Sequence, residues 1–286
     1  MLSRRLREAG HTLRRFVRVS AAFIEEQGLI SWDPYSGQLP ERYLEGCDTV
    51  INLCGVNIGA SRWTADRRRL IIDSRVIPTE LIARKLAGMP DPPHQLLNAS
   101  AAGYYGLHDV GRQLTESNPS GQGFLSELCR RWEEATSIAD WAGIQVARMR
   151  FGVVLGDGGF LDRLVPLFRA NLGGRLGHGQ QPLSWIAIPD LVRAVEFLIE
   201  HPVIAGGVNV SSPFPVTNEE LTLKLAEVLG KRAFLPVPGW ALKLVYGDLA
   251  HEALLNGQAI VPKKLKDAGF EFKYPELSAA LKHALR

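Results

Sequence analysis

Residues 98–106 bring together the groups of this chain that are best suited to proton chemistry. The segment reads Asn-Ala-Ser-Ala-Ala-Gly-Tyr-Tyr-Gly and follows a short apolar run that begins at Gln95. Small residues let a bound molecule approach the backbone, and the hydroxyls of Ser100, Tyr104 and Tyr105 can donate or share protons. Open α/β sheets bind ligands outside the carboxyl ends of their strands, as here. A plain strand-to-helix connection with two packing tyrosines is the alternative, and the segment alone does not decide between the two.

Other reactive groups are few. The seven histidines are scattered, and none pairs with another at metal-ligand spacing, so we predict no metal site. Ser100 lacks the Gly-x-Ser-x-Gly motif of a hydrolase nucleophile. Cys129 lies on the apolar side of a predicted helix, which indicates a buried, inert thiol. A tyrosine acts as a proton donor only where a neighbour lowers its pKa, and no lysine lies close in sequence to Tyr104 and Tyr105.

Strands and helices alternate along most of the chain, as the pattern of apolar residues shows. We predict strands over 12–19, 47–53, 145–155 and 207–210, and helices over 63–87, 124–142, 161–171 and 189–200. This alternation is typical of βαβ units and of an α/β fold with a mainly parallel sheet. The pattern changes after Val216, where Thr217 and Glu220 form a capping-box motif at the start of a helix. We therefore expect 1–210 to form one domain and 211–286 a small, mostly helical lid or substrate subdomain.

A second place suited to a ligand follows the predicted strand at 47–53. The loop Cys54-Gly-Val-Asn57 is built of small residues, a pattern that suits contact with a dinucleotide. In the helix that follows, an arginine run at 67–69 indicates a solvated face. Arg75 stands near the middle of this helix and can reach a phosphate, although a surface ion pair is the commoner role for such a residue.

Composition excludes several classes of protein. Hydrophobic residues make up 46% and charged residues 22% of the 286 residues, which is ordinary for a soluble globular protein. The net charge of +3 is too small to indicate nucleic acid. Three widely spaced cysteines form no disulfide framework, and no apolar run is long enough to span a bilayer. We expect a cytoplasmic protein with no membrane or nucleic-acid partner.

The first 18 residues carry six of the arginines and only one acidic residue. An arginine-rich, amphipathic start also fits an organellar transit peptide. We favour another interpretation, because Gly10 and His11 lead directly into a predicted strand. In that interpretation the chain begins inside the first helix of a nucleotide-binding unit.

Many short motifs, in order along nearly the whole chain, match one family. They are Ile30-Ser-Trp-Asp-Pro34, Val50-Ile-Asn-Leu-Cys-Gly55, Asp73-Ser-Arg75, Ala99-Ser-Ala-Ala-Gly-Tyr-Tyr-Gly106, Leu128-Cys-Arg-Arg-Trp-Glu133, Arg150-Phe-Gly-Val-Val-Leu-Gly156, Val216-Thr-Asn-Glu219, Phe234-Leu-Pro-Val-Pro238 and Pro262-Lys-Lys-Leu265. Together they resemble the atypical extended short-chain dehydrogenase/reductases of the epimerase type. The tail resembles that family's small C-terminal domain of unknown function.

The resemblance implies a Rossmann-type, doubly wound parallel sheet that binds NADP or NAD. The family opens with a strand and a Gly-x-x-Gly-x-x-Gly loop that holds the pyrophosphate, and this sequence has neither. We interpret the first strand as absent through a misassigned or truncated start; a degenerate protein that binds nothing is the alternative. The family's Tyr-x-x-x-Lys pair falls on Leu125 and Cys129, and neither residue can perform that acid–base work.

Carried over residue by residue, the resemblance implies one set of cofactor-binding positions. They are Arg18 beside a 2′-phosphate, Leu53, Cys54 and Gly55, then Ala99 and Ser100 beside the nicotinamide, with Phe151, Gly152 and Val153 on its far side. Ser100 and Tyr105 remain the candidate catalytic residues. We expect an NADP-dependent epimerase or oxidoreductase, monomeric or homodimeric, acting on a small and nucleotide-sugar-like substrate. A non-catalytic NADP-binding sensor or scaffold is the alternative.

Overall fold

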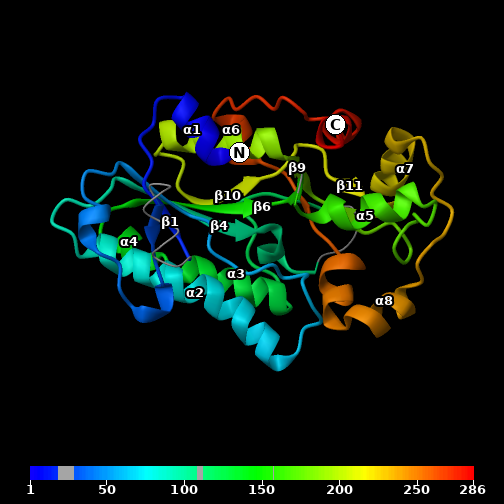
Figure 1. Ribbon diagram of the computed structural model, residues 1–286, viewed down its shortest axis with the longest axis horizontal. Helices are drawn as coiled ribbons and strands as arrows, with labels where there is room; N and C mark the ends of the chain where they lie inside the picture. The colour runs from blue at the N-terminus through cyan, green and yellow to red at the C-terminus, as the bar shows by residue number, and fades with distance from the viewer. Residues whose placement is uncertain (19–28, 108–111, 157) are drawn as a thin grey trace.

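A four-stranded parallel sheet forms the centre of the molecule (Figure 1). The computed structural model describes residues 1–18, 29–107, 112–156 and 158–286. The strands are β3 (Thr49–Asn52), β4 (Gln95–Ala101), β6 (Gln145–Phe151) and β10 (Gly206–Val210), and they lie in the order β10-β6-β4-β3. The central strands β4 and β6 are buried on both faces, as near-continuous apolar runs in a parallel sheet require. The expected α/β fold with a mainly parallel sheet is confirmed.

Helices cover both faces of this sheet (Figure 1). One face carries α2 (Ala65–Ala87), α3 (Phe124–Glu134) and α4 (Ser137–Trp141), and the other carries α1 (Leu2–Glu8) and α6 (Ile188–Glu200). The side chain of Thr64 accepts a hydrogen bond from the amide of Arg67 and so caps the start of α2. Helices on both faces of a parallel sheet give the doubly wound arrangement that the sequence predicts.

The first two strands form a separate parallel pair. They are β1 (Arg15–Val17) and β2 (Leu29–Ser31). The predicted strand at 12–19 therefore shortens to three residues, and its last position lies outside the described residues. Within the described part of the chain, β3 pairs only with β4 and β1 only with β2. One edge of β3 is thus left without a strand.

Two predicted elements are interrupted in the structure. The helix expected over 124–142 breaks into α3 and α4 around Thr136, whose hydroxyl accepts a hydrogen bond from the Arg148 guanidinium, 2.9 Å between the two atoms. The strand expected over 145–155 breaks into β6 and β7 (Val153–Leu155). The amide of Gly152 turns to the carbonyl of Val210, and Val153 begins the pairing of β7 with β9 (Trp185–Ala187). Partners far along the chain cause both breaks.

A second hydrophobic core lies beside the end of the sheet. Helices α5 (Phe160–Arg169), α7 (Asn218–Leu229) and α10 (Leu277–Ala284) enclose a core with β7 and β9. The capping box predicted at Thr217 and Glu220 is confirmed. Shorter elements complete the fold: α8 (Gly239–Tyr246), α9 (Lys263–Asp267) and the short strands Gln113–Leu114, Pro182–Leu183, Val216–Thr217 and Ala259–Ile260. Among the described residues, no helix is both long and apolar enough to cross a membrane.

Candidate functional site

A buried ion pair lies at the carboxyl ends of β4 and β6. The guanidinium of Arg150 donates from Nε to Glu133 Oε1 and from Nη2 to Glu133 Oε2, each over 2.8 Å. Both side chains are almost fully buried, at 5% and 9% exposed. Two parallel hydrogen bonds between planar groups are the strongest form of this interaction, so the pair fixes the position of Arg150 precisely at the sheet edge.

Ser100 and Tyr105, the two predicted catalytic residues, both bind this ion pair. The Ser100 hydroxyl donates to Glu133 over 2.7 Å. The Tyr105 hydroxyl accepts from Arg150 over 2.9 Å and donates to the side-chain oxygen of Asn209 over 2.7 Å. The five side chains therefore form one continuous polar network that draws on β4, β6, β10, α3 and the short helix Ala102–Tyr105.

Electrostatics give the Tyr105 hydroxyl a strong preference for its protonated form. Burial raises the pKa of Tyr105 to about 12, although the charge and the hydrogen bond of Arg150 oppose this shift. Burial alone would lower the pKa of Arg150, but the hydrogen bonds and charge of Glu133 outweigh burial and raise it. At neutral pH the Tyr105 phenol is therefore uncharged and lies in contact with a charged ion pair. Proton transfer by Tyr105 stays a prediction.

The variant Tyr105→Phe is expected to lose less stability at high pH than the unaltered protein does. A folded-state pKa above the ordinary value means that the native state holds the proton more tightly than the unfolded state does. The contribution of Tyr105 to the free energy of unfolding is therefore fully present below pH 10 and is lost as the pH rises toward 12. Since one pKa unit corresponds to about 1.4 kcal/mol, this loss amounts to about 3 kcal/mol. Urea unfolding at pH 9 and pH 11.5 captures about 2 kcal/mol of this loss, because pH 11.5 still lies below the folded-state pKa. Tyr35→Phe, at a tyrosine that is 43% exposed, is the control and should leave the pH slope unchanged. A slope equally steep in Tyr105→Phe would contradict the prediction.

The positions of the family's Tyr-x-x-x-Lys pair face the same sheet edge. A Cβ added at Gly103 would lie 3.1 Å from Cβ of Leu125 and 3.7 Å from Sγ of Cys129. Cys129 is 2% exposed, and burial raises the pKa of its thiol to about 12, while the nearby charge of Arg75 opposes the shift. The prediction of a buried thiol at Cys129 is confirmed, and an uncharged thiol cannot replace the cation of a lysine.

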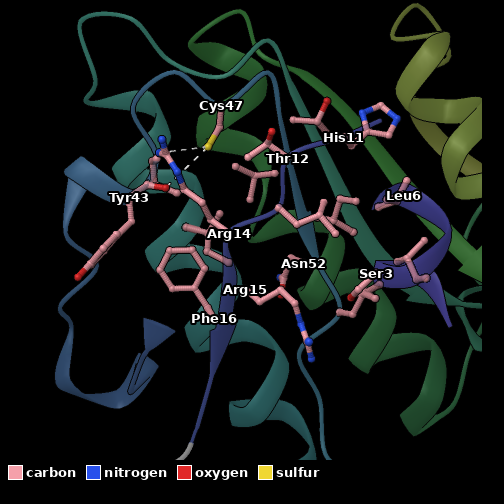
Figure 2. A pocket seen from close by; sticks show the side chains of 18 of the residues that line it. Ser3, Leu6, His11, Thr12, Arg14, Arg15, Phe16, Tyr43, Cys47 and Asn52 are labelled. Atoms are coloured by element: carbon pink, nitrogen blue, oxygen red, sulfur yellow. Dashed lines mark hydrogen bonds between the residues drawn. The ribbon is translucent and has the colours of Figure 1, made fainter. Parts of the chain in front are cut away.

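A cavity of about 1040 Å³ lies between β1 and β3 (Figure 2). Its walls include Phe16 of β1, Asn52 of β3 and Leu6 of α1, and Arg14 crosses it to donate to the carbonyl of Glu45 over 2.7 Å. This volume is at the upper end of the range for small-molecule sites, about 300–1000 Å³. The described residues hold no group of three or more His, Cys, Asp or Glu side chains that could bind a metal ion.

Three predicted cofactor-binding residues line this cavity. They are Arg18, which lies with its guanidinium 5.5 Å from the ring centre of Tyr35, and Leu53 and Cys54, which follow β3. Gly55 comes next in the chain and touches Arg75, because a Cβ there would lie 2.9 Å from Cζ of the arginine. These positions come from separate parts of the sequence, and the structure brings them together.

The remaining predicted cofactor residues lie along the same edge but outside the cavity wall. Ala99 and Ser100 are buried in β4, beside Met149 and Arg150 in the register of β6. Phe151 ends β6, and Gly152 and Val153 carry the chain from β6 into β7. Because all four strands run parallel, their carboxyl ends meet at one edge of the sheet, where ligands bind in this class of fold.

Sequence reasoning missed Glu133, Arg150 and Asn209 as members of the site. One signal was present for Arg150, which lies between the apolar residues Met149 and Phe151 within a predicted strand. A charge in such a place needs a buried partner of opposite sign. The partner itself, Glu133, is 17 positions away on a different element, and the family motif that ends at Glu133 does not show that the two residues pair.

Comparison with known proteins places these features in one family. Residues 1–210 match the NAD dependent epimerase/dehydratase family, and residues 237–284 match a domain of unknown function (DUF1731). The epimerase family protein Mb2239 of Mycobacterium bovis is 41% identical over 284 residues, which are 99% of this chain and 92% of the relative.

Two solved structures resemble this one along almost the whole chain. The crystal structure of human epimerase family protein SDR39U1 (isoform 2) with NADPH has a TM-score of 0.88 and 30% identity, covering 99% of this chain and 94% of the human one. The nucleoside-diphosphate sugar epimerase of Corynebacterium glutamicum has a TM-score of 0.79 and 32% identity, covering 99% of this chain and 55% of its own. The chain belongs to the NAD dependent epimerase/dehydratase family, among the SDR39U1-like epimerase family proteins.

Proposed function

We propose that this protein binds NADP and acts as an epimerase or oxidoreductase on a small, nucleotide-sugar-like substrate. The observation that carries the proposal is the meeting of Arg18, Leu53 and Cys54 in one cavity at the carboxyl edge of the sheet. The human relative of similar structure was crystallised with NADPH, and the Corynebacterium relative is named a nucleoside-diphosphate sugar epimerase.

The cavity and the neighbouring strand ends offer the groups that such a cofactor needs. The exposed guanidinium of Arg18 suits the 2′-phosphate of NADP. Leu53, Cys54 and Gly55 offer backbone on which the middle of a dinucleotide can lie, and Ala99 and Ser100 would hold its nicotinamide end. The bound cofactor supplies hydride transfer. The chain's own residues then bind and orient the substrate, and we assign the segment 211–286 as the lid that covers it.

A non-catalytic NADP-binding protein is the second candidate, and a specific observation favours it. Leu125 and Cys129 stand where the family has its tyrosine and lysine, and the pKa values of Cys129 and Tyr105 both rise to about 12. Efficient general acids have pKa values near the operating pH. Incubation with nucleotide sugars, with absorbance at 340 nm and chromatography of the sugar product followed together, separates the two functions. An oxidoreductase changes the absorbance, an epimerase forms an epimerised sugar with no net change in the cofactor, and a sensor binds the cofactor without forming either product.

Arg18→Glu is expected to weaken NADPH binding at least tenfold and to leave NADH binding unchanged. The variant replaces the cation proposed for the 2′-phosphate, a group that NADH lacks. Trp32 lines the cavity, so tryptophan fluorescence reports a titration with either cofactor. Arg4→Glu is the control, since Arg4 is highly exposed and does not line the cavity. Equal loss of NADPH affinity in both variants would overturn the role of Arg18, and no NADPH binding by the unaltered chain would overturn the cofactor site.

A further inference from the structure

A group of exposed apolar side chains lies on and beside α8, at the end of the molecule that also carries α5 and α7 (Figure 1). Single exposed apolar side chains are normal on a protein surface, whereas a group of them indicates a surface that binds something else. Six fall within residues 234–246, and two more lie in α5 and shortly after it. We call the eight the apolar band: Leu167, Leu172, Phe234, Leu235, Trp240, Leu244, Val245 and Tyr246.

Helix α8 carries half of this band and is covered on one side only. It buries Leu242 and packs against the short helix Ala250–Leu254. Trp240 and Leu244 are four positions apart and so lie on one face, where they are 72% and 70% exposed. Lys243 is the only charged residue of α8, and the hydrophobic cores formed by the described residues include no side chain of this helix. A helix that is apolar almost all round is normally buried, so the exposed face lacks a partner that would cover it.

Backbone hydrogen bonds join the other parts of the band. The amide of Leu172 donates to the carbonyl of Leu167 over 2.8 Å at the end of α5. The amide of Leu235 donates to the carbonyl of Gly173 over 3.3 Å, so the segment that leads into α8 runs beside the segment that follows α5. Helix α8 then begins at Gly239. The parts of the band are therefore neighbours in space as well as in sequence.

The segments that carry the band, 160–172 and 231–248, have an uncompensated positive charge. Their two carboxylates are already bound, since Asp162 accepts a hydrogen bond from a backbone amide and Asp248 pairs with Arg68. Four cations of these segments form no ion pair or side-chain hydrogen bond with any residue that the structure describes: Arg169, Lys231, Arg232 and Lys243. The band thus combines apolar side chains with cations that have no anionic partner.

This combination argues against a second copy of the chain as the partner. In a symmetric dimer the same surface meets itself, so the cations of the two copies would face each other with no free carboxylate between them. A bilayer with anionic lipids has the complementary charge, and it accepts apolar side chains beneath its headgroups. Trp240 suits that boundary, because its ring is apolar and its indole N–H forms no hydrogen bond within the described ranges of the chain.

We propose that the apolar band docks on the surface of a bilayer that contains anionic lipids. Trp240 and Leu244 enter the boundary between headgroups and acyl chains, and Lys243 binds the lipid phosphates beside them. The sequence predicted no membrane partner from the length of its apolar runs, which bears on crossing a bilayer and not on contact with its surface. This inference is independent of the proposed function.

Sedimentation of the full chain with unilamellar vesicles, at constant ionic strength, tests the proposal. Vesicles of phosphatidylcholine and phosphatidylglycerol in equal parts are expected to bind the unaltered protein, and vesicles of phosphatidylcholine alone should bind it at least about tenfold more weakly. The double variant Trp240→Ser with Leu244→Ser should weaken binding to the anionic vesicles at least about tenfold, because it removes apolar surface. Lys243→Gln should weaken it about fivefold, the effect of one cation near an anionic surface.

The double variant Trp141→Ser with Val203→Ser is the matched control. Trp141 belongs to α4, at the other end of the molecule (Figure 1), and the two side chains are 84% and 85% exposed. The control makes the same kind of change outside the band, so it should bind vesicles as the unaltered protein does. Equal melting temperatures show that the variants are folded. Lys243→Gln removes no apolar surface, so it keeps the test decisive should the Trp240 and Leu244 variant fail to fold.

Three results with vesicles would overturn the proposal: no binding to anionic vesicles, equal binding to both kinds of vesicle, or equal weakening in the control. Light scattering of the protein without vesicles adds a fourth. A dimer that dissociates in the Trp240→Ser and Leu244→Ser variant would assign the band to a second copy of the chain, and a monomer in both proteins supports the lipid surface.

Discussion

Arg150→Met is expected to lower the free energy of unfolding by about 3–5 kcal/mol. The substitution leaves the Glu133 carboxylate buried without its cation, and it removes the donor that the Tyr105 hydroxyl accepts. The ring of Tyr104 also loses contact, because its centre lies 3.4 Å from the guanidinium carbon of Arg150. Breaking one side of a buried pair costs far more than the pair itself contributes.

Urea unfolding followed by tryptophan fluorescence measures this effect. Arg130→Met is the matched control on the neighbouring helix, since the ion pair of Arg130 with Glu134 is exposed and contributes less than about 1 kcal/mol. The double variant Arg150→Met with Glu133→Leu should recover most of the loss, because it leaves no unpaired buried charge. Equal stability losses in Arg150→Met and Arg130→Met would show that the network does not support the sheet edge.

The sequence alone was enough to predict those strands and helices that are marked by local patterns of residues. The strand at 47–53 and the helix at 63–87 appear as β3 and α2 because apolar runs and the Thr64 cap are properties of neighbouring residues. The same holds for the capping box of α7. Such signals need no knowledge of tertiary structure, and they determine the order of strands and helices along the chain.

The breaks within elements were not predictable, since they depend on distant partners. Helix α3 ends where Arg148 binds Thr136, and β6 ends where Gly152 turns to Val210. Burial along α2 was not predictable either: Leu70 is 42% exposed, although it stands directly before the fully buried Ile71. Periodicity marks an apolar face only approximately where a long helix reaches beyond the sheet that it covers.

Residue types identified part of the site. Ser100 and Tyr105 were chosen for their hydroxyls, and the structure brings both to one buried ion pair. The chemical state of that pair could not be foreseen, because the pKa of Tyr105 depends on burial and on Arg150, which lies 45 positions away. A site assembled from five elements is a property of the folded chain.

A second prediction with a large expected effect concerns the cavity between β1 and β3. Each of these strands pairs on one side only within the described residues, and both contribute to the cavity walls. Unpaired backbone amides and carbonyls along a strand form a template for another strand. Half-buried apolar side chains, Phe16, Val50 and Ile51, face this volume as well. The cavity therefore has the properties of a place for one further strand of the sheet.

An engineered N-terminal extension that supplies an apolar strand followed by a Gly-x-x-Gly-x-x-Gly loop is expected to raise both stability and NADPH affinity. Each 1 kcal/mol gained from pairing raises the melting temperature by about 2–4 °C. The loop adds backbone amides and a helix N-terminus for the pyrophosphate. Two hydrogen bonds to a charged group contribute about 1.5–3 kcal/mol each, and each 1.4 kcal/mol is a factor of ten in affinity, so we expect at least about a hundredfold tighter binding.

Two variants of the extension separate the contribution of the strand from that of the loop. An extension with the same strand but with the three glycines replaced by alanine should keep the gain in melting temperature and lose the gain in NADPH affinity, because Cβ atoms block the close approach of the pyrophosphate to the backbone. A strand with its apolar side chains replaced by charged ones should lose both gains, since the charges would face Phe16 and Val50 inside the cavity. If the intact extension changed neither quantity, the cavity would not be a strand site, and the proposed cofactor site would have to work without a glycine loop.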